Sequence, residues 1–361
     1  MSEQELVGTA RERLNGVQDH GEFQNCSSLD QYLAELRPLL DRPGVTELCL
    51  NRPGEVFIED GEGWQRLALP IAGFAWALSF VKLIAASTQQ RIDPECPLLT
   101  ASLPSGERVQ AVIPPATLAG QVVVAIRKPS AVEWGLAELA ARGVFARVRA
   151  AGGLSGEEGA EGTLADELAR GQVAAFLQRA VRARLNILVS GATGSGKTTL
   201  TRALIAEIDP AERLVSIEDA AELSLATHAN SVRLFYSKDG QGASRVTPKQ
   251  LLAASLRLRP DRILLAELRG EEAYDFLRNV NSGHPGSITS VHASSATLAF
   301  EQLTLLVKES PGGREMGRED IQALLRQTVD VVVQCGRDSA GRRGVEEVWY
   351  RKGGHGGGDQ I

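Results

Sequence analysis

The stretch GATGSGKTTL, residues 191–200, decides the fold of this chain. It has the form Gly-x(4)-Gly-Lys-Thr, in which backbone N–H groups of a glycine-rich loop surround phosphate oxygens at the start of a helix. Residues 185–190 before it form an apolar run typical of a buried strand, and Leu200, Leu204 and Ile208 after it share one helical face. Strand, glycine loop and helix in this order are the context of a P-loop, so the sequence predicts a nucleotide site here.

The residue types of the loop predict its contacts with the nucleotide. The ammonium group of Lys197 can reach the β- and γ-phosphates, and the hydroxyl of Thr198 can ligate Mg²⁺. ATP and Mg²⁺ are therefore the expected cofactors. The residues expected to bind them are Gly191, Ala192, Thr193, Gly194, Ser195, Gly196, Lys197, Thr198 and Thr199.

A first acidic segment follows the P-loop. In VSIEDAAEL, residues 215–223, an apolar strand leads directly into Glu218, Asp219 and Glu222. Ligands of α/β proteins bind at the carboxyl ends of the strands, which favours a catalytic role for these carboxylates. Acidic residues also stabilise the N-terminus of a helix, and the residues alone leave the two interpretations equally open.

A second acidic segment resembles a Walker B strand. In RPDRILLAELRG, residues 259–270, four apolar residues precede Glu267. A carboxylate at this place can hold the water shell of Mg²⁺ or orient the attacking water. It can also simply close an ordinary strand, but the presence of a P-loop favours the catalytic interpretation.

Histidines flank one further strand. The segment NSGHPGSITSVHA, residues 281–293, has His284 before and His292 after a short apolar run. Two histidines could ligate a metal, but no third ligand is spaced to join them. A role of His292 beside the γ-phosphate is therefore favoured over zinc binding.

Three arginines are candidates for stabilising the transferred phosphate. Arg108 follows a predicted turn at residues 104–106, Arg127 ends a predicted strand, and Arg259 precedes the Walker B-like strand. An arginine beside a phosphate stabilises the transition state and can come from a neighbouring subunit. Most surface arginines have no such role, so the sequence alone does not choose among the three.

The composition divides the chain into two folded parts. Residues 131–165 are rich in Ala, Gly and Glu, which is typical of a flexible linker. The predicted divisions are a disordered N-terminus at 1–25, an α+β domain with an antiparallel sheet at 26–130, the linker at 131–165, a P-loop domain at 166–350 and a disordered tail at 351–361.

Apolar periodicity predicts the elements of both parts. The first part should contain helices at 29–40 and 74–86, a hairpin turned at 51–54, two strands within 97–115 and a strand at 121–127. The second part should contain strands at 185–190, 214–217, 231–235, 262–265, 287–291 and 329–334, helices at 248–258, 271–282 and 296–308, and a terminal hairpin within 331–350. Alternating strands and helices predict a largely parallel sheet that is covered on both faces.

The composition narrows the function classes. The chain has 361 residues, 43% of them hydrophobic, and a formal net charge of −6. The negative balance disfavours strong direct binding of nucleic acid. The sequence has no apolar run of about 20 residues, as a membrane span needs, and its N-terminus lacks the apolar core of a signal peptide. A cytoplasmic location is therefore expected.

The four motifs together resemble the ATPases of type II and type IV secretion and of type IV pilus machines. They are most similar to the VirB/Trb-type DNA-transfer ATPases of type IV secretion systems. The P-loop, the Asp box SIEDAAEL, the Walker B segment and the His box occur in family order, and NRPGEV, LPSGERVQAVIPP and IRKPS match the family's N-terminal domain. The resemblance covers about residues 30–335.

The resemblance implies a homohexameric ring of RecA-like P-loop domains stacked on the N-terminal domains, with ATP between them. It implies that Glu222 is the catalytic carboxylate of the Asp box, with Glu218 as second choice, and that Glu267 and His292 belong to the catalytic set. It further implies that Arg108 and Arg127 reach the phosphates from the N-terminal domain and that Arg259 acts beside the site.

The function implied by the resemblance is ATP hydrolysis that powers the transfer of DNA or protein and pilus assembly. The expected partners are inner-membrane subunits of the secretion system, which would hold the chain at the membrane periphery. A P-loop kinase or nucleotide switch and a DNA translocase are the alternatives. The long linker would also allow the N-terminal domain to pack on a neighbour's P-loop domain instead of its own.

Overall fold

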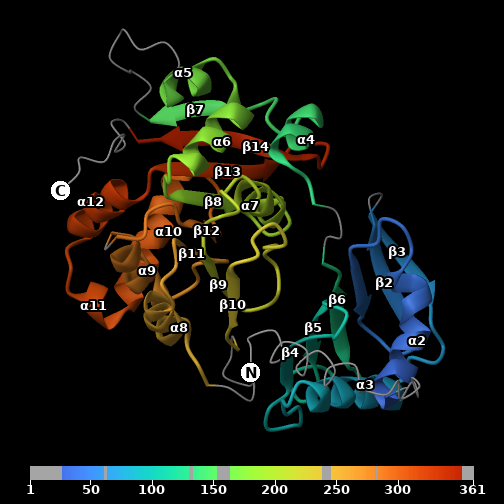
Figure 1. The fold of residues 1–361 in the computed structure, drawn as a ribbon. Helices are drawn as coiled ribbons and strands as arrows, with labels where there is room; N and C mark the ends of the chain where they lie inside the picture. The colour runs from blue at the N-terminus through green and yellow to red at the C-terminus, as the bar shows by residue number, and fades with distance from the viewer. Residues whose placement is uncertain are drawn as a thin grey trace, which may run out of the picture.

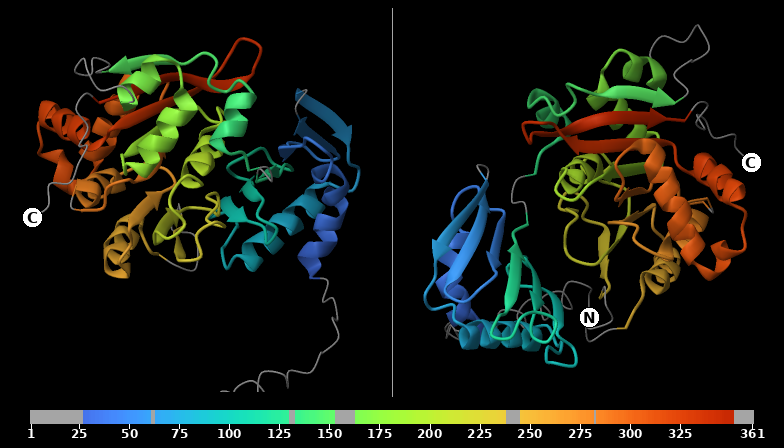
Figure 2. Two further views of the ribbon diagram at one scale, coloured as in Figure 1. Left: turned by 45° about the horizontal axis from the view of Figure 1, so that its top comes forward. Right: turned by 180° about the vertical axis from the view of Figure 1, so that it is seen from behind.

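The structure is a computed structural model, and it describes residues 27–60, 63–129, 133–152, 163–237, 245–281 and 283–351. Two sheets organise these residues (Figure 1). In the views of Figures 1 and 2, the N-terminal sheet and its helices lie to one side of the larger C-terminal part. The predicted fold class, an α+β N-terminal part and a P-loop part with a largely parallel sheet, is confirmed.

The N-terminal part is an antiparallel sheet packed against two helices. The sheet order is β3-β2-β1-β6-β5-β4, and the buried residues of alternate strand positions face the helices. The first helix begins where Ser27 and Asp30 form a capping box. The elements are α2 (Ser28–Leu40), β1 (Glu47–Leu50), β2 (Glu55–Asp60), β3 (Gly63–Ala68), α3 (Phe74–Ser87), β4 (Leu98–Ser102), β5 (Arg108–Val112) and β6 (Val123–Arg127).

The C-terminal part is an eight-stranded sheet in the order β10-β9-β11-β12-β8-β13-β14-β7. The pairs from β10 to β13 are parallel, the hairpin β13–β14 is antiparallel, and β7 joins β14 in parallel. The strands are β7 (Arg149–Gly152), β8 (Ile187–Gly191), β9 (Leu214–Glu218), β10 (Ser231–Phe235), β11 (Arg262–Leu265), β12 (Ile288–Val291), β13 (Val331–Arg337) and β14 (Arg343–Tyr350).

Helices cover both faces of this sheet, which explains why its central strands are buried along their whole length. One apolar core lies under α4 (Leu136–Ala141), α5 (Leu164–Ala169), α6 (Val173–Arg182) and α7 (Lys197–Ile205). The other lies under α8 (Pro248–Ser255), α9 (Glu272–Asn281), α10 (Ala296–Glu309) and α12 (Arg318–Thr328). Two short helices, η1 (Leu256–Leu258) and α11 (Pro311–Arg314), complete the part.

The range predicted as a linker contains two elements that the composition did not predict. Helix α4 contributes Leu136 and Leu139 to the core beneath α6 and α7, and β7 pairs with β14 at the edge of the sheet. Residues 153–162 of this range, the predicted N-terminal disorder before Ser27 and the predicted tail after Arg351 lie outside the described residues.

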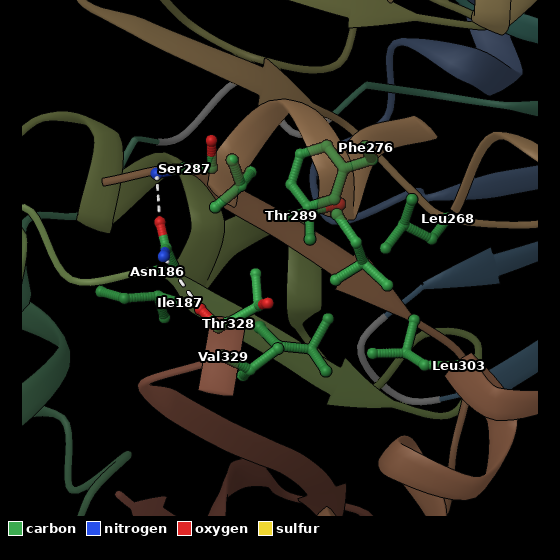
Figure 3. Close-up of a pocket in the computed structure, with 12 residues that line it drawn as sticks. Asn186, Ile187, Leu268, Phe276, Ser287, Thr289, Leu303, Thr328 and Val329 are labelled. Carbon is green, nitrogen blue, oxygen red and sulfur yellow. Dashed lines mark hydrogen bonds between the residues drawn. The ribbon is translucent and has the colours of Figure 1, made fainter. Parts of the chain in front are cut away.

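A small cavity lies inside the C-terminal core, between the sheet and helices α9 and α10 (Figure 3). Its volume is about 10 Å³, and its lining is almost entirely apolar although Ser287 and Thr289 are among the lining residues. Beside it, Asn186 accepts from the backbone N–H of Ser287 at 3.2 Å and donates to the carbonyl of Thr328 at 2.9 Å. Ligand pockets are at least about 300 Å³, so this cavity is a packing void near the amino ends of the strands.

None of the helices in the described part of the chain combines the length and the apolar composition that a membrane span requires.

Candidate active site

The P-loop joins the central strand β8 to helix α7. Strand β8 ends at Gly191, and the helix begins at Lys197. Gly194 and Gly196 have φ angles of 73° and 101°. These angles lie in the left-handed region, which glycine adopts without steric cost, so the loop needs glycine at both positions. The loop's backbone is therefore shaped by its own sequence at the carboxyl edge of the sheet.

Lys197 lies folded across the loop. Its Nζ donates to the carbonyl oxygens of Gly191 at 2.7 Å and Ala192 at 3.1 Å, and lies 3.1 Å from Nδ1 of His292. Burial lowers the pKa of Lys197, although the Glu267 carboxylate opposes this. The ammonium group thus lies at the opening of the loop. There, phosphate oxygens of a bound polyphosphate would replace the two carbonyl oxygens as its partners.

His292 connects the lysine to Glu267. The two residues follow the neighbouring strands β12 and β11, and Nε2 of His292 lies 2.6 Å from Oε1 of Glu267. Burial and the charges of Lys197 and Arg269 lower the pKa of His292 despite that carboxylate. A neutral ring can accept from Lys197 through Nδ1 and turn an Nε2–H toward Glu267. The structure therefore brings together three predicted residues, because His292 contacts both Lys197 and Glu267.

Arg269 is a site residue that the sequence did not reveal. Its guanidinium pairs with Glu267 and lies 2.5 Å from Asp219 through Nη1. Burial by itself would lower the pKa of Arg269, but these two carboxylates outweigh burial and raise it above its ordinary value. Glu272 fixes the loop by accepting from the backbone N–H of Arg269 at 2.6 Å. An arginine two residues after an acidic strand end carries no distinguishing signal, so only the fold identifies it.

Arg108 reaches this site from the N-terminal sheet of the same chain. It donates to Asp219 at 2.7 Å and pairs with Glu222. Glu222 in turn accepts from the Thr198 hydroxyl at 3.4 Å. The N-terminal part thus contacts the Asp box through an arginine that is partly exposed.

Glu218 occupies a different environment from Glu222. Its side chain is 0% exposed and pairs with Arg233 at 3.0 Å. It also accepts from the hydroxyl of Ser216 at 2.7 Å and from the backbone N–H groups of Glu222 and Leu223 at 2.8 Å. Glu218 therefore holds the Asp-box turn in shape, and this placement favours Glu222 over Glu218 as the carboxylate that meets substrate.

Two predicted arginines are not in contact with this P-loop. Arg127 is exposed and stands directly opposite Arg108 in the β5–β6 ladder, so it lies on the same face of the N-terminal sheet. Arg259 is exposed before the amino end of β11, whereas the P-loop lies at the carboxyl ends of the parallel strands. The structure thus places Arg127 beside the site and Arg259 at the opposite edge of the sheet.

Comparisons with known proteins agree with this architecture. The family model for type II/IV secretion system proteins matches residues 165–347. The type IV secretion system protein VirB11 of Bartonella quintana is 44% identical over 330 residues, which cover 88% of this chain and 92% of the relative. The chain belongs to the VirB11 family of type IV secretion system ATPases.

Solved structures support the membership. The VirB11 ATPase of the Brucella suis type IV secretion system, crystallised with sulphate, is 44% identical, with a TM-score of 0.50 over 90% of this chain and 98% of that one. The pilus retraction motor PilT with bound ADP is only 15% identical, with a TM-score of 0.56 over 88% of this chain and 82% of that one, and it shows the shared fold alone.

The VirB11-family site has the chemical groups that a bound triphosphate and a divalent cation require. Lys197 in the loop and Arg108 at the Asp box supply positive charge, and Thr198 and Glu222 place a hydroxyl and a carboxylate side by side. Hard oxygen donors of this kind suit Mg²⁺. Oε1 of Glu267 is buried and lies 2.6 Å from Nε2 of His292, so the histidine holds this carboxylate beside the loop.

Proposed function

We propose that this chain hydrolyses ATP in its P-loop, with Mg²⁺ as the metal cofactor. The observation that carries the proposal is the contact series from Lys197 through His292 to Glu267. It places the lysine of the loop and the carboxylate after β11 in one site, and both are parts that phosphoryl transfer uses. Membership of the VirB11 family of ATPases supports the same conclusion.

Each residue has a distinct part in the proposed reaction. The ammonium group of Lys197 binds the β- and γ-phosphate oxygens, and the hydroxyl of Thr198 would hold Mg²⁺, which would neutralise charge on the same oxygens. Glu222, beside Thr198, acts in the chemical step. Glu267 orients the attacking water, with His292 keeping its carboxylate in place. Arg108 exchanges its ion pairs with Asp219 and Glu222 for a contact with the γ-phosphate, where it stabilises the charge of the transition state.

The proposed working form is a homohexameric ring that powers the transfer of DNA or protein and pilus assembly by a type IV secretion system. Its partners are inner-membrane subunits of that system, and the ring lies at the cytoplasmic side of the membrane as a peripheral component. Because the formal net charge is −6, direct binding of nucleic acid is weak.

The test uses the purified full-length chain. Native mass spectrometry should detect a six-fold ring that MgATP stabilises, and phosphate release should rise as the ring forms. A ring that binds MgATP without releasing phosphate would contradict the enzymatic proposal and support a nucleotide switch. Tight, salt-dependent retention of DNA on a filter would instead support a DNA translocase.

A further inference from the structure

The hairpin of β13 and β14 runs past the P-loop and carries two arginines on one face. Arg337 and Arg343 are the last directly opposed pair of this ladder. Residues opposite each other in an antiparallel pair point to the same side of the sheet. Cys335, two residues before Arg337, belongs to the core beneath α7, so this face is the one that carries the P-loop helix.

Both arginines lie against the glycines of the loop. Arg337 donates to the carbonyl oxygen of Gly194 through Nε at 3.1 Å and Nη2 at 2.9 Å. A side-chain carbon at Gly196 would lie 3.9 Å from Cβ and Cδ of Arg343. Among the described residues, neither guanidinium pairs with a carboxylate. The outer side of the P-loop is therefore lined by two positive charges with N–H groups to spare.

The turn that presents these arginines is held by Asp338. Its carboxylate accepts from the backbone N–H groups of Ala340 at 3.0 Å and Arg342 at 2.8 Å. It also pairs with Arg147 at 3.0 Å, which ties the hairpin to the segment before β7. Because the hairpin is already ordered, a ligand that meets its arginines pays little conformational entropy.

The order of strands indicates the direction in which a bound nucleotide extends from its γ-phosphate to its nucleoside. Glu267 and His292 follow β11 and β12, on one side of β8, whereas β13 lies on its other side. The γ-phosphate belongs on the first side, because Lys197 turns toward His292 there. A triphosphate is a linear chain, so its α-phosphate and nucleoside extend away from those residues.

We propose that Arg337 and Arg343 form the subsite for the nucleoside end of the nucleotide. This inference rests on the proposed function and names a part of the same site. The spare N–H groups of Arg337 bind the α-phosphate, and the planar guanidinium of Arg343 stacks on the base. A stacked guanidinium contacts the face of a base and none of its hydrogen-bonding edges, so this subsite serves ATP and GTP alike.

The decisive experiment compares a nucleotide with its polyphosphate part alone. Binding of MgADP, MgGDP and inorganic tripolyphosphate to full-length R343A is measured by calorimetry. Loss of one stacking contact should weaken both nucleotides about tenfold and leave the affinity for tripolyphosphate unchanged. R337A should weaken nucleotides similarly, but it also removes the contact with Gly194, so R343A carries the test.

The control is R342A, which removes the same charge from the same hairpin. Arg342 is 78% exposed in its side chain and pairs with Asp338, so this variant should bind all three ligands as the unaltered protein does. Equal losses for nucleotides and tripolyphosphate in R343A would mean that the arginine only shapes the loop, and unchanged nucleotide binding would also overturn the subsite. An unaltered protein that binds none of the three ligands would instead overturn the proposed function.

Discussion

The two sheets of the molecule hold their functional side chains in different ways. At the end of β9 in the C-terminal sheet, Glu218 is completely buried and satisfied by several donors. On the N-terminal sheet, Arg108 and Arg127 stand side by side on the face that turns away from the buried Val109 and Ile126. One sheet is covered on both faces and the other on one.

This difference separates a fixed half of the site from a movable half. A polar group between two helical layers must be satisfied within the protein, because leaving it unpaired costs about 1–3 kcal/mol. An arginine on a solvent-exposed face can exchange one ion-pair partner for another at little cost in free energy, because water hydrates its guanidinium during the exchange. The C-terminal sheet therefore fixes the groups that we propose bind phosphate, whereas the N-terminal sheet supplies a group that can exchange its partners.

The largest effect should follow from removing the fixed cation. Lys197→Ala should lower ATP turnover by about 1000-fold, because no other side chain of the loop can replace its charge on the γ-phosphate. Phosphate release by the purified variant measures this. Lys249→Ala is the control, because Lys249 is 52% exposed and pairs only weakly with Asp275 at 3.5 Å. Ordinary turnover in Lys197→Ala would refute the assignment of the P-loop.

The next effect concerns stability. Glu218→Gln should lower the free energy of unfolding by about 3 kcal/mol, because it breaks a buried ion pair and leaves Arg233 without its partner. Denaturant unfolding measures the change. Glu95→Gln is the matched exposed case, with a side chain 83% exposed, and should stay within about 0.5 kcal/mol. Equal stability of both variants would show that burial of the carboxylate does not decide how strongly it is fixed.

Glu267→Gln and Glu222→Gln should act on turnover rather than on binding. Each should lower kcat about 100-fold while the affinity for ATP changes little, because the lost interaction operates mainly during the chemical step. Single-turnover kinetics and equilibrium binding separate the two quantities. If either variant binds ATP poorly and turns over normally at saturation, its role in catalysis is wrong.

The movable half is tested by the two neighbouring arginines. Arg108→Ala should lower turnover about tenfold, because Arg108 already reaches the Asp box. Arg127→Ala should have a smaller effect, because no contact of Arg127 with the site is present in the described residues. Steady-state rates give the comparison. A double variant with the full rate would show that the N-terminal sheet does not complete the site.

The smallest effect is a dependence of stability on pH. The pKa of His292 is lowered in the folded protein by burial and by Lys197. Its contribution to stability is therefore complete above the ordinary histidine pKa of about 6.5 and is lost as the pH falls through the lower folded value. Because the side chain is 46% exposed, the loss should be only about 1 °C in Tm. His292→Gln should abolish this slope, and an unchanged slope would assign it to another group.

Much of the fold followed from periodicity, because the C-terminal strands are continuous apolar runs and a doubly covered sheet requires such runs. The segment around β7 did not follow, because Ala and Gly at an edge strand look like a linker until β14 is present to pair with them. The residues of the Asp box by themselves could not rank Glu218 against Glu222 either, and only the family resemblance put Glu222 first. The two lie four residues apart, and only the position of Arg233 in the neighbouring strand shows which of them is buried.

The site was predictable where one segment carries the chemistry and not where several segments meet. The conformation of the loop from Gly191 to Thr199 is determined by its own residues, above all by its glycines. Arg269, in contrast, pairs with Glu267, which is two residues before it, and with Asp219, which follows another strand, and Asp219 joins it to Arg108. No spacing rule connects these residues.

The attachment of β7 has a mechanical consequence. The chain leaving the N-terminal sheet enters the P-loop part through α4 and then β7, whose residues pair in register with residues 347–350 of β14. A pull transmitted from the N-terminal sheet acts along the strand, so the hydrogen bonds of the ladder share the load and would have to break together. The junction between β7 and β14 is therefore a shear joint that is stiff under tension, and β14 is itself one strand of the hairpin that runs past the P-loop.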